Sequence, residues 1–171
     1  MAVLPAPRTW TVGELVTAAK LNNDVRDGIN FLLSPPMAVL LPDGGQYAND
    51  TDTVVRWSSE ALDRDGGHDN TTNNTRYTAQ TAGWYDFDFS AFIFGGQSSG
   101  ILFLGFTKNA NVSWAAGSGF PLALNRLSGQ LSTTLQMSVG DYIQAWVRHT
   151  TGGSKTLDST GTRFAIRWVS T

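Results

Sequence analysis

The sequence predicts an all-β protein, a jelly-roll sandwich of about eight to ten antiparallel strands that follows an N-terminal arm and one α-helix. Threonine, serine, asparagine and glycine are abundant, which is typical of a chain with many strands and turns. From residue 37 onward, short segments with period-two alternation are separated by glycine-rich turns. One segment near the N-terminus has helical spacing instead.

The charge and composition of the 171 residues exclude several classes of protein. The net charge is −2, whereas a nucleic-acid or polybasic membrane-binding surface needs clustered lysine and arginine. The absence of cysteine excludes disulfides and thiolate chemistry. No apolar run approaches the ~20 residues that span a bilayer, and residues 1–10 do not resemble a secretory signal. We therefore expect neither a nucleic acid nor a membrane as partner.

Residues 1–16 form the predicted arm, since prolines and Gly13 interrupt any periodicity. We expect the arm to be extended, with Trp10 as its main contact residue. An alternative is an earlier helix start, in which Thr11 and Glu14 form a capping box, but it would place Gly13 in the first helical turn.

The spacing of apolar residues predicts a helix over residues 17–33. The Thr17 hydroxyl is suited to cap its N-terminus, and the following Ser34-Pro35-Pro36 ends it, because proline lacks an N–H donor. One face carries an apolar stripe: Leu21, Val25, Ile29, Leu32 and Leu33. A lone helix of about 25 Å is marginally stable in water. The stripe therefore predicts a partner, which is the rest of the chain, further copies of it, or another protein.

These features divide the chain into residues 1–36, which comprise the arm, helix and Pro-Pro linker, and residues 37–171, which comprise the sandwich. The most regular predicted strand is 83–94. The other predicted strands are 37–41, 53–57, 75–79, 101–107, 120–124, 131–137, 142–149 and 163–168.

Aromatic residues occupy both faces of the 83–94 strand. One face is expected to fill the core and carries Tyr85, Phe87, Phe89, Ala91 and Ile93. The opposite face carries Trp84, Phe92 and Phe94. An exposed apolar band favours association between copies. We therefore interpret Trp84, Phe92 and Phe94 as a trimer interface.

The segment from Asp63 to Asp69 gathers carboxylates around a glycine turn. Asp63, Asp65 and Asp69 are candidate ligands for calcium, which prefers oxygen donors. The sequence lacks the later glutamate of a complete calcium loop. The simpler interpretation is an exposed turn whose aspartates accept hydrogen bonds from their own backbone. We expect no metal or other cofactor, with calcium as the alternative.

No motif predicts catalysis, so we expect a protein that is not an enzyme. Residues 96–100 match the pattern G-x-S-x-G, but an apolar strand follows them in place of the required helix. His149 precedes a Thr/Gly-rich segment that predicts a surface loop. A hydrolase is a further alternative, although the sequence shows no carboxylate pair of the glycosidase kind.

The six tryptophans are spread along the chain, and aromatic faces can stack on sugar rings. Trp146 and Trp168 alternate in phase with predicted core residues, so we expect both to be buried. Trp114 lies in a predicted loop and is the candidate for contact with a glycan. A carbohydrate-binding module that uses Trp114, Trp57 or residues 63–69 is therefore the alternative to a structural protein.

Residues 8–22 read RTWTVGELVTAAKLN, and Arg26-Asp27 and Phe31-Leu32 follow. The T-A-A-x-L-N core with the preceding G-E resembles the N-terminal segment of many small virion proteins of tailed bacteriophages, notably those of actinobacteria. The resemblance implies a location in the virion. We expect the anchor to the particle to comprise Trp10, Leu21, Val25, Ile29 and Leu32.

Two further stretches, Ala82-Gly83-Trp84-Tyr85-Asp86-Phe87 and Leu135-Gln136-Met137-Ser138-Val139-Gly140-Asp141-Tyr142-Ile143, contain the patterns G-x-Y-x-F and L-x-x-G-D-x-V. They are similar to strands of the complement-globular-head and tumour-necrosis-factor jelly-roll superfamily. Residues 162–166 resemble the last strand of that superfamily but lack the glycine after Phe164. The resemblance implies a sandwich of about ten strands that forms a homotrimer around an aromatic-lined axis, without catalysis.

Together the features give the hypothesis of a bacteriophage virion structural protein. It is a trimeric jelly-roll appendage that partners with itself, with capsid or tail proteins, and with a host cell-surface glycan. Two placements stay open: a tail or baseplate adhesin that attaches to the host, and a head fibre or capsid decoration.

Overall fold

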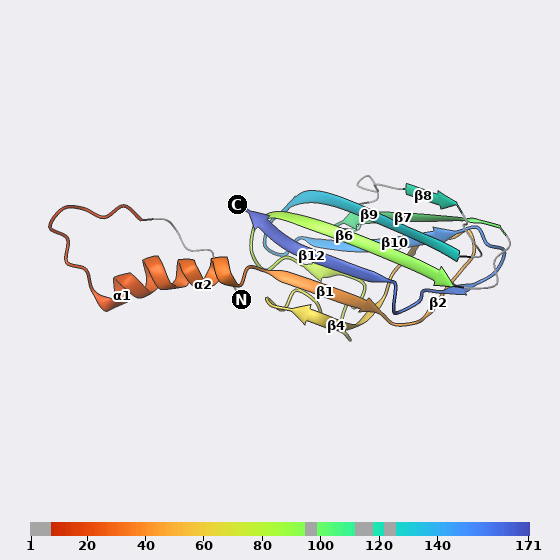
Figure 1. Cartoon of the computed structure of the whole chain (residues 1–171), viewed down its shortest axis with the longest axis horizontal. Helices are drawn as coiled ribbons and strands as arrows, with labels where there is room; N and C mark the ends of the chain where they lie inside the picture. The colour runs from red at the N-terminus through yellow and green to blue at the C-terminus, as the bar shows by residue number, and fades with distance from the viewer. Residues whose placement is uncertain (1–7, 95–98, 112–117, 122–125) are drawn as a thin grey trace.

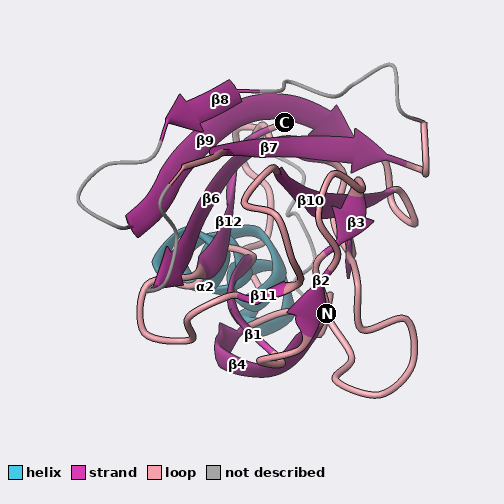
Figure 2. Ribbon diagram, turned by 90° about the vertical axis from the view of Figure 1, so that its right-hand side faces the viewer, coloured by secondary structure: helices cyan, strands magenta, loops and turns pink. Residues whose placement is uncertain are grey.

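The computed structural model describes residues 8–94, 99–111, 118–121 and 126–171. Figure 1 shows a β-sandwich, here termed the head, from one end of which a helical segment projects. The C-terminus lies beside the junction between these two parts. In Figure 2, where the head is viewed from its opposite end, the strands surround a central core and the helix lies behind them.

Two sheets form the head within the described ranges. The first has the order β4-β1-β12-β6-β9 and consists of β1 (Met37–Pro42), β4 (Trp57–Asp63), β6 (Gly83–Phe94), β9 (Arg126–Met137) and β12 (Arg163–Ser170). The second has the order β3-β10-β7-β8, with β5 paired to β10, and consists of β3 (Thr53–Val54), β5 (Tyr77–Thr78), β7 (Ile101–Lys108), β8 (Ser118–Pro121) and β10 (Tyr142–His149). A short ladder joins β2 (Gln46–Tyr47) and β11 (Lys155–Thr156). The antiparallel pairing of the distant strands β1 and β12 agrees with a jelly roll, so the predicted fold class is confirmed.

The core lies between the two sheets and is largely aromatic. The inward face of β6 is buried along its whole length, as predicted from the alternation of Tyr85 to Ile93. Phe164 of β12 is fully buried, and its ring centroid lies 5.6 Å from that of Phe106 on β7 in the other sheet. Ring pairs of this kind stabilise a core beyond the burial of their area. They join the two sheets at the centre of the head.

The motif around Gly83 has a local structural reason. Gly83 has a φ of 148°, and a Cβ atom there would lie 2.3 Å from Trp168 Nε1 and 2.4 Å from the Ser170 carbonyl oxygen. Glycine therefore lets β6 begin against the end of β12. The Tyr85 hydroxyl donates a hydrogen bond to the Thr81 carbonyl at 2.7 Å, which fixes the chain at the entry to β6.

Asp141 closes the turn between β9 and β10. Its carboxylate accepts hydrogen bonds from Ser138 N and the Asn109 side-chain amide, both at 2.8 Å, and pairs with Lys108 Nζ at 2.8 Å. These groups, Lys108 first, lower the pKa of Asp141 to about 2. Gly140, with a φ of 89°, supplies the left-handed residue of the turn. The Gly-Asp pair thus ties β10 to the end of β7.

The helical segment consists of α1 (Ala18–Leu21), the π-helical turn η1 (Asn22–Arg26) and α2 (Asp27–Leu33). The predicted helix over residues 17–33 is confirmed. Thr17 Oγ1 accepts a hydrogen bond from Lys20 N at 3.3 Å and so caps the segment. The helix ends before Ser34, and β1 begins after the two prolines. No helix in the described part of the chain is long and apolar enough to cross a membrane.

The predicted strand 53–57 is wrong, because the chain changes sheets within it. β3 pairs with β10 of the second sheet, whereas β4 begins at Trp57 and pairs with β1 of the first sheet. Val55 lies fully buried between them and donates its N–H to the Ala145 carbonyl at 2.9 Å. The apolar run is therefore a crossover, and the more polar sequence after Trp57 forms the edge strand β4.

Trp146 is not a core residue, contrary to the prediction. On β10 every second side chain from Ile143 to His149 is buried, and Trp146 has the opposite phase. Its ring covers Gly105 on β7, where a Cβ atom would lie 2.2 Å from the ring. Trp168, by contrast, packs partly buried against the core.

Candidate functional site

The described residues leave the apolar stripe of the helical segment uncovered. The exposed fractions along it are 46% for Leu21, 42% for Val25, 51% for Ile29 and 76% for Leu32. Phe31 is the buried exception, at 5%, and its ring meets that of Trp168 edge-on with centroids 4.8 Å apart. The head therefore contacts the base of the helix and leaves the stripe accessible.

The π-helical turn keeps the stripe straight. Leu21, Val25 and Ile29 are spaced by four residues, and each such step in a regular α-helix drifts about 40° around the axis. Within η1 the Asp27 N–H bonds to the Asn22 carbonyl, five residues back, so the turn is wider than an α-turn. The wider turn offsets the drift, and the stripe stays on one side of the helix.

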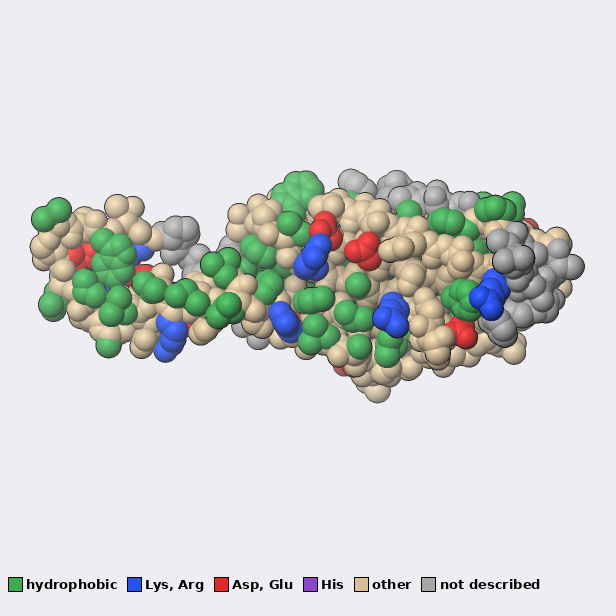
Figure 3. All heavy atoms as spheres, in the orientation of Figure 1, with side chains coloured by type: hydrophobic (Ala, Val, Ile, Leu, Met, Phe, Trp, Pro, Cys, Tyr) green, Lys and Arg blue, Asp and Glu red, His purple; other side chains and the backbone are tan. Residues whose placement is uncertain are grey.

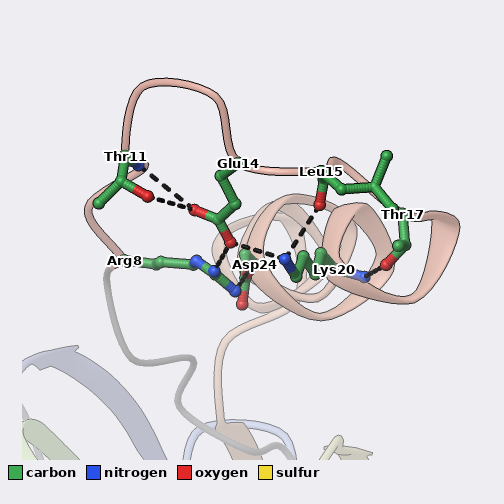
Figure 4. Close-up of polar contacts among 7 residues, drawn as sticks. All are labelled: Arg8, Thr11, Glu14, Leu15, Thr17, Lys20 and Asp24. Atoms are coloured by element: carbon green, nitrogen blue, oxygen red, sulfur yellow. Dashed lines mark hydrogen bonds and ion pairs between the residues drawn. The ribbon is translucent and has the colours of Figure 1, made fainter.

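The arm folds back beside the helix and is held there by Glu14 (Figure 4). The Glu14 carboxylate pairs with Arg8 and, at 2.7 Å, with Lys20, and it accepts a hydrogen bond from Thr11 N at 3.3 Å. Arg8 also pairs with Asp24 at 3.2 Å. We term Arg8, Thr11, Glu14, Lys20 and Asp24 the arm clasp. One carboxylate thus joins donors from the arm and from the helix.

The fold of the arm differs from the expected extended conformation. The Glu14 N–H donates to the Thr11 carbonyl at 3.1 Å, and Gly13 has a φ of 82°, as at the third position of a type II turn. The capping-box alternative is also wrong, since the helix begins only at Ala18. Trp10 stays 39% exposed, with the Arg8 guanidinium 4.8 Å from its ring centroid.

Among the side chains that the structure describes, the outward face of the first sheet is mixed in character. Trp84 is 41% exposed and Phe92 is partly buried, and both lie on this face of β6. Asp86, Asp88 and Ser90 separate them over about 27 Å of extended strand. The two aromatic side chains are therefore isolated from each other. Their role in a trimer interface stays a prediction.

Charged and polar side chains pair across this face. Asp86 accepts a hydrogen bond from the Thr134 hydroxyl at 2.7 Å and pairs with Arg167 at 3.2 Å. These contacts, that of Thr134 first, lower the pKa of Asp86. Figure 3 shows green, blue and red side chains interspersed over the visible face of the head. A second protein on this face would have to match polar as well as apolar groups.

The loop after β4 uses its aspartates in three different ways. Asp63 accepts hydrogen bonds from the backbone N–H groups of residues 66–68, at 3.0 to 3.3 Å. Asp65 is buried and accepts one from the Tyr77 hydroxyl at 2.9 Å. Asp69 accepts from the backbone of the turn that follows it. Nowhere in the described structure do three carboxylate or imidazole side chains come close enough to hold a metal, so the candidate calcium ligands do not converge.

The pKa values in this loop follow the surroundings of each carboxylate. Burial raises the pKa of Asp65, and burial also raises the pKa of Tyr77, which donates to it. The N–H groups of Thr72 and Thr71 lower the pKa of Asp69 to about 2. The loop is therefore an exposed turn only in part, because Asp65 fastens it to the core.

Both histidines are structural groups in the head. The ring nitrogens of His68 face the backbone carbonyls of Arg76 and Trp57, at 2.8 and 3.3 Å. His149 is fully buried, with Nε2 3.0 Å from the Tyr47 carbonyl oxygen, so the predicted surface loop is wrong. The sequence signal that could have revealed the burial of His149 is its phase, because it continues the alternation of Ile143, Ala145 and Val147 on β10.

Other predicted residues are either buried or lie outside the described structure. Trp57 is fully buried, which removes it as a glycan contact. Trp114, the side chain of Phe94 and residues 96–98 lie outside the described structure.

Comparison with known proteins supports the fold. No family model matches the sequence, and no curated protein matches it either. The globular domain of zebrafish complement 1qA is similar in structure, with 16% identity, a TM-score of 0.55, and coverage of 78% of this chain and 97% of that domain. Murine APRIL is similar at 12% identity and a TM-score of 0.54, with coverage of 78% and 98%. Another structure of murine APRIL, at pH 5.0, is similar at 13% identity and a TM-score of 0.54.

The head therefore has a jelly-roll fold similar to that of the complement 1qA globular domain and of APRIL. The jelly-roll fold implied by the resemblance at Gly83–Phe87 and Leu135–Ile143 is thus confirmed. Identities this low describe the fold and leave the activity of the chain open.

Proposed function

We propose that the chain is a bacteriophage virion structural protein. It is a homotrimeric jelly-roll appendage, without enzymatic activity, that its N-terminal segment anchors to capsid or tail proteins. The head projects from the particle and either attaches to the host surface or decorates the capsid. The resemblance of residues 8–22 to N-terminal segments of phage virion proteins supports the location.

The observation that carries the proposal is the uncovered stripe on a helix that projects from the head. Apolar side chains that are 42–76% exposed on a helix of this length favour burial against other chains. Three parallel copies would bury Leu21, Val25 and Ile29 at a common centre. Such a bundle forms a stalk, and Trp10 with the arm clasp would contact the particle around it.

The mass of the chain in solution tests the assembly. We expect light scattering to give three times the 18.5 kDa of one chain. A triple variant, Leu21→Asn with Val25→Asn and Ile29→Asn, is expected to give one chain mass while its head stays folded, because these side chains are 42–51% exposed and lie outside the core of the head. The matched control replaces three residues of the polar back: Asn23→Ser, Arg26→Ser and Asn30→Ser. A monomeric wild type at high concentration contradicts the proposal.

Antibody labelling of purified particles tests the placement. Label on tail tips indicates an adhesin, and label on capsids indicates decoration or a head fibre. Absence of label on both, with the protein present in infected cells, contradicts a virion role.

A carbohydrate-binding module without a role in particle stability is the second candidate function, with Trp114 as a predicted glycan contact. A polar pocket in the head favours it, and binding without particle incorporation would distinguish it.

A further inference from the structure

A polar pocket of about 250 Å³ lies between the loop after β4 and the start of β5. The residues that line it are Gly66, Gly67, His68, Asp69, Thr72, Asn73, Arg76, Thr78 and Gln80. Its volume is slightly below the ~300–1,000 Å³ of sites for drug-sized ligands. The lining contains no aliphatic side chain beyond threonine methyls. The pocket therefore suits a small polar ligand, or one unit of a polar chain.

The walls of the pocket are held in place by buried contacts. A Cβ atom on Gly67 would lie 2.2 Å from the Tyr77 ring, so glycine lets the loop pack directly on that buried ring. Asp63 fixes the backbone of residues 66–68 by three hydrogen bonds. His68 joins the two sides of the pocket through its contact with the Arg76 carbonyl. A ligand would meet a preformed wall, and binding would order little.

Two charged groups in the lining keep unused hydrogen-bonding capacity. The Arg76 guanidinium lies 4.5 Å from the Tyr142 ring centroid, and the described residues offer it no hydrogen bond or ion pair. Asp69 receives its hydrogen bonds, from Thr71 and Thr72, on Oδ1. Its Oδ2 has no hydrogen-bond donor within the described structure. The lining of one pocket thus contains the N–H donors of the Arg76 guanidinium and an acceptor oxygen, Oδ2 of Asp69.

This combination selects a class of ligand. Neighbouring hydroxyl groups can accept hydrogen bonds from a guanidinium and donate to a carboxylate. A simple anion is disfavoured by Asp69, which stays ionised above about pH 2. A simple cation is disfavoured by Arg76. A neutral polyhydroxylated ligand satisfies both groups.

We propose that the pocket binds a neutral saccharide unit through Arg76 and Asp69. The inference rests on the proposed function, in which the head attaches to the host surface, and it assigns a glycan contact in that attachment to residues other than Trp114. The pocket is built from one chain, so binding does not require the trimer.

The test is saturation-transfer NMR with neutral tetrasaccharides of glucose, galactose, mannose and N-acetylglucosamine, and with glucose 6-phosphate and a sialylated trisaccharide as anionic probes. We expect at least one neutral tetrasaccharide to bind. Arg76→Met, which keeps the apolar stem over Tyr142, is expected to weaken binding by about tenfold or more. The matched control is Arg64→Met, in the same loop but outside the pocket, and it is expected to bind like the wild type.

A second variant guards against misfolding of the first. Asp69→Asn keeps the acceptor oxygen for Thr71 and Thr72 and is also expected to weaken binding. The inference is overturned if no neutral saccharide binds, if only the anionic probes bind, or if neither variant changes the affinity. The mass of each sample separates the two proposals. A trimer that binds nothing contradicts the pocket, whereas a monomer that binds contradicts the assembly.

Discussion

Regular apolar patterns occur in both the head and the helical segment, but only in the head are the apolar side chains of the pattern buried. On β6 the alternating residues Phe87 and Phe89 are fully buried against the other sheet of the same chain. On the helical segment, equally regular residues such as Val25 and Ile29 remain 42% and 51% exposed. Periodicity therefore defines which side chains share a face, and it does not define what covers that face.

The junction between the two regions is where burial of the helix against the head ends. Phe31 is the last residue of the helix whose side chain is buried, and it packs on Trp168 at the edge of the core. The backbone N–H of Trp168 donates a hydrogen bond to the Pro36 carbonyl at 3.0 Å. Beyond Phe31 toward the N-terminus, the helix has no contact of this kind with the head among the described residues.

Truncating an aromatic ring in the core is expected to show the contrast most strongly. Phe164→Ala should lower the free energy of unfolding by about 3–5 kcal/mol, because the ring packs against four aromatic neighbours in both sheets. Leu32→Ala, in the exposed stripe, should cost less than about 0.5 kcal/mol in dilute protein. Urea denaturation followed by tryptophan fluorescence measures both. Equal losses of unfolding free energy in the two variants would contradict the contrast between the head and the helix.

Gly83→Ala probes the junction. The new Cβ would collide with Trp168 and Ser170, so we expect a loss of about 1–3 kcal/mol and a displaced Trp168 ring. Gly153→Ala is the control, because a Cβ atom there meets nothing within 4 Å. Thermal unfolding measures the stability, and NMR contacts between Phe31 and Trp168 report the junction. If those contacts survive unchanged, the helix is held by more than this ring pair.

Acid should affect the head through Asp141. Its pKa is lowered to about 2 in the folded protein, below the ordinary 3.8, so it contributes stability above pH 3.8 that is lost as the pH falls toward 2. Asp141→Asn should cost about 1–2 kcal/mol at neutral pH and flatten the pH dependence of stability between pH 4 and 2. Asp52→Asn, at an exposed carboxylate 3.6 Å from Arg148, is the control. An unchanged acid profile in Asp141→Asn would contradict this assignment.

Glu14→Gln tests the arm clasp and should have the smallest effect on stability. The pairs with Arg8 and Lys20 lie near the surface, so a loss of less than about 1 kcal/mol is expected. Release of the arm should instead appear as faster tryptic cleavage after Arg8 and Lys20. Glu60→Gln is the control. Cleavage at an unaltered rate would show that other contacts hold the arm.

Local chemistry allowed much of the head to be predicted. The strand 83–94 was predicted with its correct bounds, because alternation in a strand buried on one face leaves a clear period of two. The Thr17 cap and the proline stop defined the helix for a similar reason, since each depends on neighbouring residues alone.

The errors lie where distant segments decide the outcome. Trp146 is turned away from the core because the opposite phase of β10 faces the other sheet, and a tryptophan there can lie flat on Gly105. The run 53–57 has strand-like residues but crosses between sheets. His149 is buried because β2 and its neighbours cover the end of β10.

The candidate pocket likewise depends on segments that are distant in the sequence. The sequence brought the aspartates of residues 63–69 to attention as ligands, yet two of them bind their own backbone and Asp65 binds Tyr77. Arg76, Thr78 and Gln80 lie further along the chain, and the packing of the loop on Tyr77 brings them into one pocket lining with Asp69.

The amino-acid sequence by itself determined the periods, the caps and the turns, because these depend on interactions between residues that are close along the chain. The tertiary structure alone decided which faces are covered. Burial depends on what the rest of the chain brings opposite a face, which is why β6 is enclosed and the stripe of the helix stays exposed in the described structure.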